Sequence, residues 1–318
     1  MADVGSSPTT KVALNNNPRC RSQLTSSVKR ETWAGENVPS ITVEGSGFPD
    51  GTQLFKVFSG GGLIAESEVE VVSGQFEKRV ELPAPLDRPR EIEVRVGSEF
   101  RQVHPVRLYR LWGRVTSFTG DPIAEPIINA SCGAGAVGDA DGYYSIVLDG
   151  PTQHVAVFDK GYSFSTLETW LYDLDLGADT PLDIRIGSLE VYELGGWLAY
   201  GGAYLHFIPM SLHRILPLVQ QGLTEQDLVA RPEIWPHLSA KDVKVFIEGQ
   251  EVPIATFSEY QDFLGEREGT KLTRPGYIVG ITREHWRPGA VRVEVSHGCE
   301  YEGKQIMERG EGYFLGFR

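Results

Sequence analysis

The 318-residue chain contains only three cysteines, and they lie far apart in the sequence. Cys20, Cys132 and Cys299 form no CxxC pair, so their number excludes a zinc–thiolate site and a dense disulfide framework. One long-range disulfide stays open as an alternative. The length allows two or three domains, each able to bury its own core.

The chain also lacks an excess of basic residues. It has 30 Lys and Arg against 43 Asp and Glu, which gives a formal net charge of −13. An acidic chain repels the phosphate backbone, and no basic cluster offsets this, so we expect no nucleic-acid partner.

Long apolar segments are missing as well. The first twenty residues, MADVGSSPTTKVALNNNPRC, lack the apolar core that a signal peptide needs. No apolar run is long enough to span a bilayer. We therefore expect a soluble chain without a membrane span, whose location the sequence does not indicate.

Familiar catalytic signatures are absent too. The sequence has no HExxH or HxH motif for a metal and no GxSxG motif for a serine hydrolase. Its glycine-rich run GSGFPDG precedes a predicted strand rather than a helix, which argues against a P-loop. The sequence thus predicts no metal site and no cofactor.

Glycine and proline are abundant, with 36 and 19 residues, and they separate short runs of alternating apolar and polar residues. Frequent turns between such period-2 runs are typical of all-β sandwiches. We predict an all-β fold of three consecutive β-sandwich-like units, spanning residues 37–108, 109–190 and 191–318. A polar N-terminal arm, 1–36, is expected to be flexible unless the chain's own body or a neighbour holds it.

In the first unit, Phe55 and Val57 are expected on one face of a strand, and Leu54, Lys56 and Phe58 on the other. The preceding run GSGFPDGT supplies a turn whose glycines suit positive φ. With this run, residues 37–108 resemble bacterial immunoglobulin-like sandwich modules. The resemblance implies a fold and no activity.

The second unit contains the run GDADGYY, which looks like the start of a calcium loop. An EF-hand needs oxygen ligands at its first and twelfth positions, but these would be Val137 and Leu148 if Gly142 takes the sixth. We therefore interpret Asp139 to Gly142 as the turn of a β-hairpin that binds no structural metal.

Four elements of the second unit resemble the carboxypeptidase regulatory-like domain, a small transthyretin-like β-sandwich. They are GRV at 113–115, GDPI at 120–123, DADGYY at 139–144 and KGY at 160–162. Gly138 departs from the pattern, because the family often has Thr there. The resemblance implies an accessory or adhesive module with a scaffold or binding role.

The third unit, 191–318, is expected to carry a helical insert at residues 209–240. Its apolar positions follow the helical spacing i, i+3, i+4 and i+7, and Pro217 interrupts them. These positions are Leu212, Ile215, Leu216 and Val219. Long excursions from a β scaffold often carry function, so the insert is the expected place for a site.

Polar and aromatic residues in or near the insert supply the candidate site residues. For acid–base catalysis without a metal, the candidates are His206, His213, His237, Tyr204, Glu284 and His285. Tryptophans stack on sugar rings as well as filling cores, and the candidates for ligand binding are Trp197, Trp235 and Trp286.

Three functions stay open at this point. The leading hypothesis is a non-enzymatic interaction or assembly protein, because two units resemble accessory modules and no catalytic motif is present. The first alternative is a metal-independent acid–base enzyme of cyclase, lyase or hydrolase type, with a site at the helical insert. The second is a carbohydrate-binding protein. The expected partners are another protein, a second copy of the chain, or a small-molecule or carbohydrate ligand.

Overall fold

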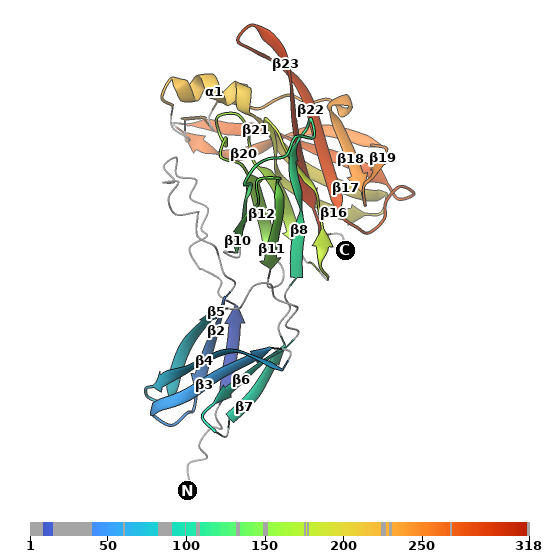
Figure 1. Cartoon of the computed structure of the whole chain (residues 1–318). Helices are drawn as coiled ribbons and strands as arrows, with labels where there is room; N and C mark the ends of the chain where they lie inside the picture. The colour runs from blue at the N-terminus through green and yellow to red at the C-terminus, as the bar shows by residue number, and fades with distance from the viewer. Residues whose placement is uncertain are drawn as a thin grey trace.

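The computed structural model describes residues 9–14, 40–59, 61–81, 91–98, 100–105, 109–131, 134–148, 152–174, 176, 178–223, 227–228, 231–267 and 269–316. Strands predominate in these residues, arranged in several sheets that face one another (Figure 1). The predicted all-β fold with sandwich-like units is confirmed. Cys20 and Cys132 lie outside the described residues.

The first unit is an immunoglobulin-like β-sandwich of two sheets (blue to cyan in Figure 1). One sheet has the order β1-β2-β5, with bounds Thr9–Leu14, Ser40–Ser46 and Gln75–Glu81. The other has the order β4-β3-β6-β7, with bounds Gly62–Val71, Gly51–Ser59, Glu91–Val96 and Phe100–Pro105.

The core of the first unit follows the predicted alternation. Phe55 and Val57 are fully buried, whereas Leu54, next to Phe55 on β3, is exposed. The turn before β3 adds a core residue that alternation does not indicate. Phe48 is buried and meets the rings of Phe76 and Phe100 edge-on.

Part of the N-terminal arm belongs to the first unit. Strand β1 pairs antiparallel with β2, from Thr9 opposite Ser46 to Leu14 opposite Ile41. The arm therefore extends the β2–β5 sheet of its own chain by one edge strand.

The second and third units share one sheet of eight strands. Its order is β10-β9-β12-β13-β23-β22-β18-β19. The bounds are Gly135–Val137, Ile127–Ala130, Thr152–Phe158, Thr169–Leu174, Lys304–Phe314, Val291–Tyr301, Val243–Ile247 and Gln250–Val252. The two halves meet where β13 and β23 run parallel, with Trp170 opposite Gly312. The sheet thus crosses the boundary expected at residue 190.

Two smaller sheets cover the eight-stranded sheet. In the second unit, β11 (Tyr143–Leu148), β14 (Thr180–Pro181) and β15 (Ile184–Ile186) all pair with β8 (Tyr109–Ser117). In the third unit the order is β16-β17-β21-β20, with bounds Leu189–Ala199, Gly202–Ser211, Thr270–Thr282 and Thr256–Arg267. Each pair of sheets encloses its own apolar cluster.

The segment around Asp139 is a turn, as expected, but not the turn of a hairpin. Oδ1 of Asp139 accepts hydrogen bonds from the backbone N–H groups of Asp141 and Tyr143, at 3.0 and 2.8 Å. Strand β10 pairs with β9, and β11 pairs with β8, so the turn leads from one sheet to the other. The hairpin prediction is wrong because each strand found a partner elsewhere in the chain.

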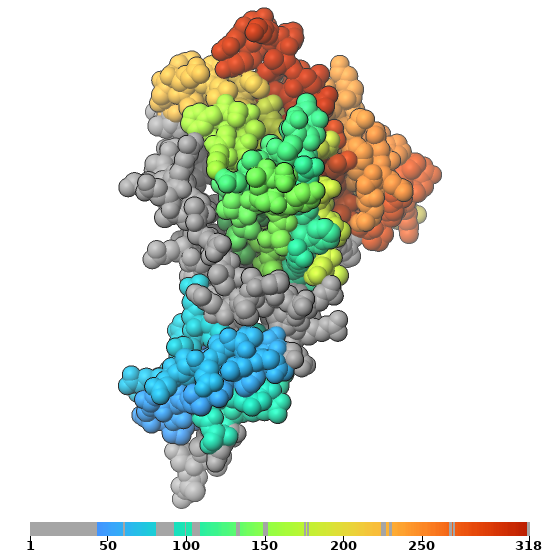
Figure 2. Space-filling view, viewed as in Figure 1, coloured from blue at the N-terminus to red at the C-terminus, as the bar shows by residue number. Residues whose placement is uncertain are grey.

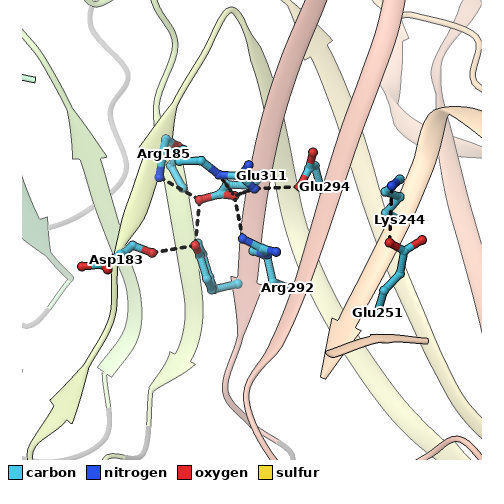
Figure 3. Close-up of polar contacts among 9 residues, drawn as sticks. Asp183, Arg185, Lys244, Glu251, Arg292, Glu294 and Glu311 are labelled. Carbon is cyan, nitrogen blue, oxygen red and sulfur yellow. Dashed lines mark hydrogen bonds and ion pairs between the residues drawn. The ribbon is translucent and has the colours of Figure 1, made fainter. Parts of the chain in front are cut away.

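A buried ionic network ties the second unit to the third (Figure 3). Arg185 on β15 donates through Nε to Glu311 on β23 at 2.9 Å, and through Nη2 to Glu294 on β22 at 2.7 Å. The Tyr313 hydroxyl lies 2.7 Å from Glu311, and Arg292 lies 3.6 Å from the same fully buried carboxylate. Since Glu311 has several partners, its charge is compensated inside the junction.

The insert contains less helix than expected for residues 209–240. Helix α1 spans Leu212–Gln220, and short 3-10 turns follow at η2 (Pro232–Ile234) and η3 (Ala240–Asp242). Leu212 is buried, and Ile215 and Leu218 pack on the cluster around Ile208. Val219 is exposed, so its predicted place on the apolar face is wrong. None of the described helices is long and apolar enough to cross a membrane.

Candidate functional site

The candidate site is the outer face of the β16-β17-β21-β20 sheet. Side chains alternate along β17, so Leu205 and Phe207 enter the core while Tyr204 and His206 point to the other face. Insert residues such as Trp235 cover one end of that face around Ile208. We call the remaining part, around Tyr204 and His206, the aromatic face.

Glycines let aromatic rings lie flat on the aromatic face. A Cβ atom at Gly195 would lie 2.5 Å from the His206 ring, and one at Gly276 would lie 2.3 Å from the Tyr260 ring. At Gly280 it would lie 3.1 Å from the Tyr204 ring. Each glycine therefore leaves room for a ring from a neighbouring strand, which is a known way to shield glycine backbone in sheets.

Trp197 completes the aromatic face from β16. It is paired across the ladder with Tyr204, and the two rings stack with centroids 5.6 Å apart and planes 14° apart. The His206 ring lies 6.0 Å from the indole. Trp197 is 43% exposed, so its ring presents apolar surface to solvent.

A charged group borders the rings. Arg274 is only 13% exposed and donates to Glu193 at 2.7 Å and to Asp262 at 2.8 Å. Its guanidinium also lies 5.6 Å from the centroid of the Trp235 ring. Two carboxylates facing one guanidinium leave this edge with a net negative charge, and all three groups are held in place by one another.

Titratable groups of the aromatic face are held in their neutral forms. Burial lowers the pKa of His206, opposed by the nearby carboxylates of Glu193 and Asp262. Burial also raises the pKa of Tyr260, with Asp262 adding to the effect. At neutral pH these rings are therefore uncharged hydrogen-bonding surfaces.

The predicted site residues do not gather in one place. Tyr204, His206 and Trp197 come together on the aromatic face, as described. Trp235 is 2% exposed and belongs to the core beneath the insert. His237 is exposed, and its Nδ1 lies 3.2 Å from the Glu259 carboxylate.

The predicted residues on the turn after β21 form a local group. His285 Nδ1 lies 2.9 Å from the Thr282 hydroxyl and 3.5 Å from the exposed Glu284 carboxylate. Trp286 packs against the core of the third unit. These contacts are typical of a stabilised turn.

His213 lies at a different place, at the start of α1. Its Nδ1 is 2.8 Å from the carboxylate of Glu308, which is fully buried on β23. The Ser211 hydroxyl donates to the same carboxylate and also caps α1 by accepting from the Arg214 N–H.

A pair of carboxyl groups, Glu190 fully buried and Glu168 half-buried, was not predicted. Glu190 on β16 is fully buried, accepts a hydrogen bond from the Trp170 indole, and interacts with Glu168. Burial and the neighbouring Glu168 raise the pKa of Glu190 well above its usual range. Burial likewise raises the pKa of Glu168 to about 7. Such a pair holds at least one proton at neutral pH.

No protein-family model matches the sequence, and no curated protein matches it. Among solved structures, a candidate carbohydrate-binding protein from Bacteroides uniformis aligns over 64% of this chain and 95% of its own, with 7% identity and a TM-score of 0.21. A DUF3823 family protein from Bacteroides ovatus aligns over 66% and 100%, with 9% identity and a TM-score of 0.19. The N-terminal eight Ig domains of Down Syndrome Cell Adhesion Molecule align over 82% and 36%, with 11% identity and a TM-score of 0.17. These TM-scores are too low to assign a function, and the carboxypeptidase regulatory-like resemblance has no matching family model.

Proposed function

We propose that this chain is a non-enzymatic binding protein whose aromatic face recognises neutral carbohydrate. The observation that carries the proposal is the exposed Trp197 ring stacked parallel to Tyr204, beside further rings that lie over glycines. The first two units serve as scaffold or spacer in this proposal, in keeping with the accessory modules that they resemble.

Ring chemistry supports a sugar ligand. The face of an aromatic ring carries partial negative charge, and the C–H bonds on one side of a pyranose present partial positive charge to it. Trp197 and Tyr204 have nearly parallel planes, 14° apart, so they present an extended surface of one orientation. A flat sugar ring matches such a surface better than an irregular peptide does.

The border of the aromatic face supplies fixed polar groups for sugar hydroxyls. Ser258 and Thr256 are exposed on β20, and Arg274, Glu193 and Asp262 hold one another in place. Few polar groups at the edge of an apolar surface usually orient a ligand. Because the carboxylates outnumber the guanidinium, we expect neutral glycans to bind and polyanionic glycans to be rejected.

Binding is favoured over acid–base catalysis by where the candidate residues lie. His213 and His237 each face their own carboxylate, Glu308 and Glu259, whereas His206 lies among the rings of the aromatic face. A general base and a general acid must reach one substrate together. This distribution supports a recognition surface rather than a shared reaction centre.

The test is binding of the whole chain to soluble polysaccharides, measured by calorimetry and by retardation in polysaccharide-containing native gels. The neutral probes are xyloglucan, mixed-linkage β-glucan and galactomannan, and the anionic probe is polygalacturonate. For a neutral probe that binds, Trp197→Ala should weaken affinity at least about fivefold, since an aromatic stacking contact contributes about 1 kcal/mol beyond the area it buries.

Trp112 provides a matched control. It is 41% exposed on β8 of the second unit, with the Arg110 guanidinium 5.6 Å from its centroid. Trp112→Ala should leave glycan affinity unchanged. The proposal is wrong if none of the neutral probes binds, or if Trp112→Ala and Trp197→Ala weaken binding equally.

A further inference from the structure

A second group of reactive side chains lies where α1 crosses the β22–β23 hairpin, and it plays no part in the proposed glycan site. The end of this hairpin projects beyond the helix (red beside gold in Figures 1 and 2). Cys299 and Glu308 come from the two hairpin strands, and His213 comes from the first turn of α1. The His nitrogen, the Cys sulfur and a Glu oxygen all lie within 4.8 Å of one another.

The surroundings of the three side chains are largely closed to water. Glu308 is fully buried, Cys299 is buried with a free thiol, and His213 is half-buried. The Tyr301 ring lies 4.8 Å from the His213 ring and covers it from the hairpin side. His213 is the most exposed of the three, with 24% of its side chain accessible, so an ion would approach from its side.

We propose that His213, Cys299 and Glu308 bind a divalent transition-metal ion, with Zn²⁺ as the best match. Zn²⁺ combines thiolate, imidazole and carboxylate ligands, and sites with three protein ligands keep a fourth position for water. Hard cations such as Ca²⁺ and Mg²⁺ prefer all-oxygen ligands and match this set poorly.

Groups around the three ligands are placed to orient them. The Ser211 hydroxyl donates to Glu308 and fixes the direction of its carboxylate, and the His213 backbone N–H donates to it at 3.2 Å. Hydrogen bonds of this kind orient ligands in metal sites and influence affinity. The same bonds also anchor α1, so a bound ion would join the helix to both hairpin strands.

Metal binding at this site must release a proton. Without an ion, a thiol with the ordinary pKa of about 8.5 is mostly protonated at neutral pH. A divalent cation reverses this preference, because a coordinated thiol is deprotonated. The thiol proton goes to solvent and the S–H bond is replaced by an S–metal bond, which makes affinity increase with pH.

The sequence excluded a zinc–thiolate site because paired cysteines are absent. That exclusion holds for sites built on CxxC pairs, but it does not cover a single thiolate completed by residues from other elements. His213 and Cys299 are 86 positions apart in the sequence, and only the packing of α1 on the hairpin brings them together.

The experiment uses the full chain with Cys20 and Cys132 replaced by Ser, so that Cys299 is the only thiol. After chelator treatment, the protein is titrated with Co²⁺, whose thiolate complexes absorb in the near-ultraviolet, and then with competing Zn²⁺. We expect the thiolate band, its loss on addition of Zn²⁺, and release of one proton. Cys299→Ser should abolish the band and weaken Zn²⁺ binding by more than about 100-fold.

A second measurement covers the case in which Cys299→Ser fails to fold. Zn²⁺ should slow alkylation of Cys299 in the single-thiol protein at least about tenfold, whereas Mg²⁺ should not. The proposal is overturned if Co²⁺ gives no thiolate band, or if Zn²⁺ leaves the alkylation rate unchanged. Glycan binding, which depends on Trp197, is measured separately, so the failure of one proposal does not affect the other.

Discussion

The carboxyl pair of Glu168 and Glu190 should make the protein less stable as pH rises. In the folded chain, burial raises the pKa of Glu168 from 4.5 to about 7, and burial together with the neighbouring Glu168 raises the pKa of Glu190 well above its usual range. The unfolded chain releases both protons near pH 4.5. Above about pH 4.5 folding therefore takes up protons at both carboxyl groups, so the free energy of unfolding falls as pH increases.

The size of this effect follows from the shift. A pKa raised from 4.5 to about 7 corresponds to at most about 3 kcal/mol across the whole window, because water reaches the half-buried Glu168. Measurements should stay above the pI of about 5.1 to keep the protein in solution. Between about pH 5.5 and about pH 8, Glu168 alone contributes roughly 2 kcal/mol of this loss, or roughly 4–8 °C in melting temperature.

The assay is thermal unfolding followed by circular dichroism at several pH values, with Glu168→Gln as the perturbation. Glutamine stays neutral in both states, so the variant should gain stability over the wild type as pH rises and exceed it at about pH 8. Glu284→Gln, on an exposed turn, should follow the wild-type curve. A constant difference between Glu168→Gln and wild type at every pH would refute the reasoning.

Three further predictions test other parts of the structure. Glu311→Ala should destabilise the chain by about 3 kcal/mol, because Arg185, Arg292 and the buried Tyr313 hydroxyl lose the carboxylate that they share. Glu251→Ala, which breaks only the exposed pair with Lys244, should change stability by less than about 1 kcal/mol in the same denaturant titration. Gly276→Ala should displace the Tyr260 ring and weaken glycan binding while circular dichroism stays unchanged; unaltered affinity would contradict the role of that ring. Deleting residues 1–36 should lower the melting temperature and leave the number of chains per particle in light scattering unchanged, because β1 pairs within its own chain; a particle with fewer chains would instead support docking on a neighbour.

Strand positions could be predicted where one sheet face is solvated. The alternation of Leu54 and Phe55 on β3 gives the correct buried side. A strand with one buried and one solvated face has apolar and polar residues in alternation, so the sequence shows which side is buried. The aromatic face was partly visible for the same reason. Tyr204, a candidate for acid–base catalysis, and Trp197, a candidate for ligand binding, lie together on this face.

Residues whose environment comes from another unit could not be predicted. Glu190 lies between the buried residues Leu189 and Val191, so alternation places it on the solvent side. Packing of the second unit buries it against Trp170, and nothing local in the sequence signals this contact. Glu311 and Cys299 were missed for the same reason, because their partners are far away in the chain.

The parallel joint between β13 and β23 has a consequence for synthesis at the ribosome. Strand β13, which contains Trp170, can pair with β23 only after Gly312 has been synthesised. At about 5–20 residues per second, that interval lasts roughly 7–28 s. During it, β13 presents an unpaired edge of the kind that nascent chains use for wrong intermolecular pairing. The fused body should therefore depend on holdase chaperones during translation, whereas the sandwich of β2 to β7 can close as soon as it emerges.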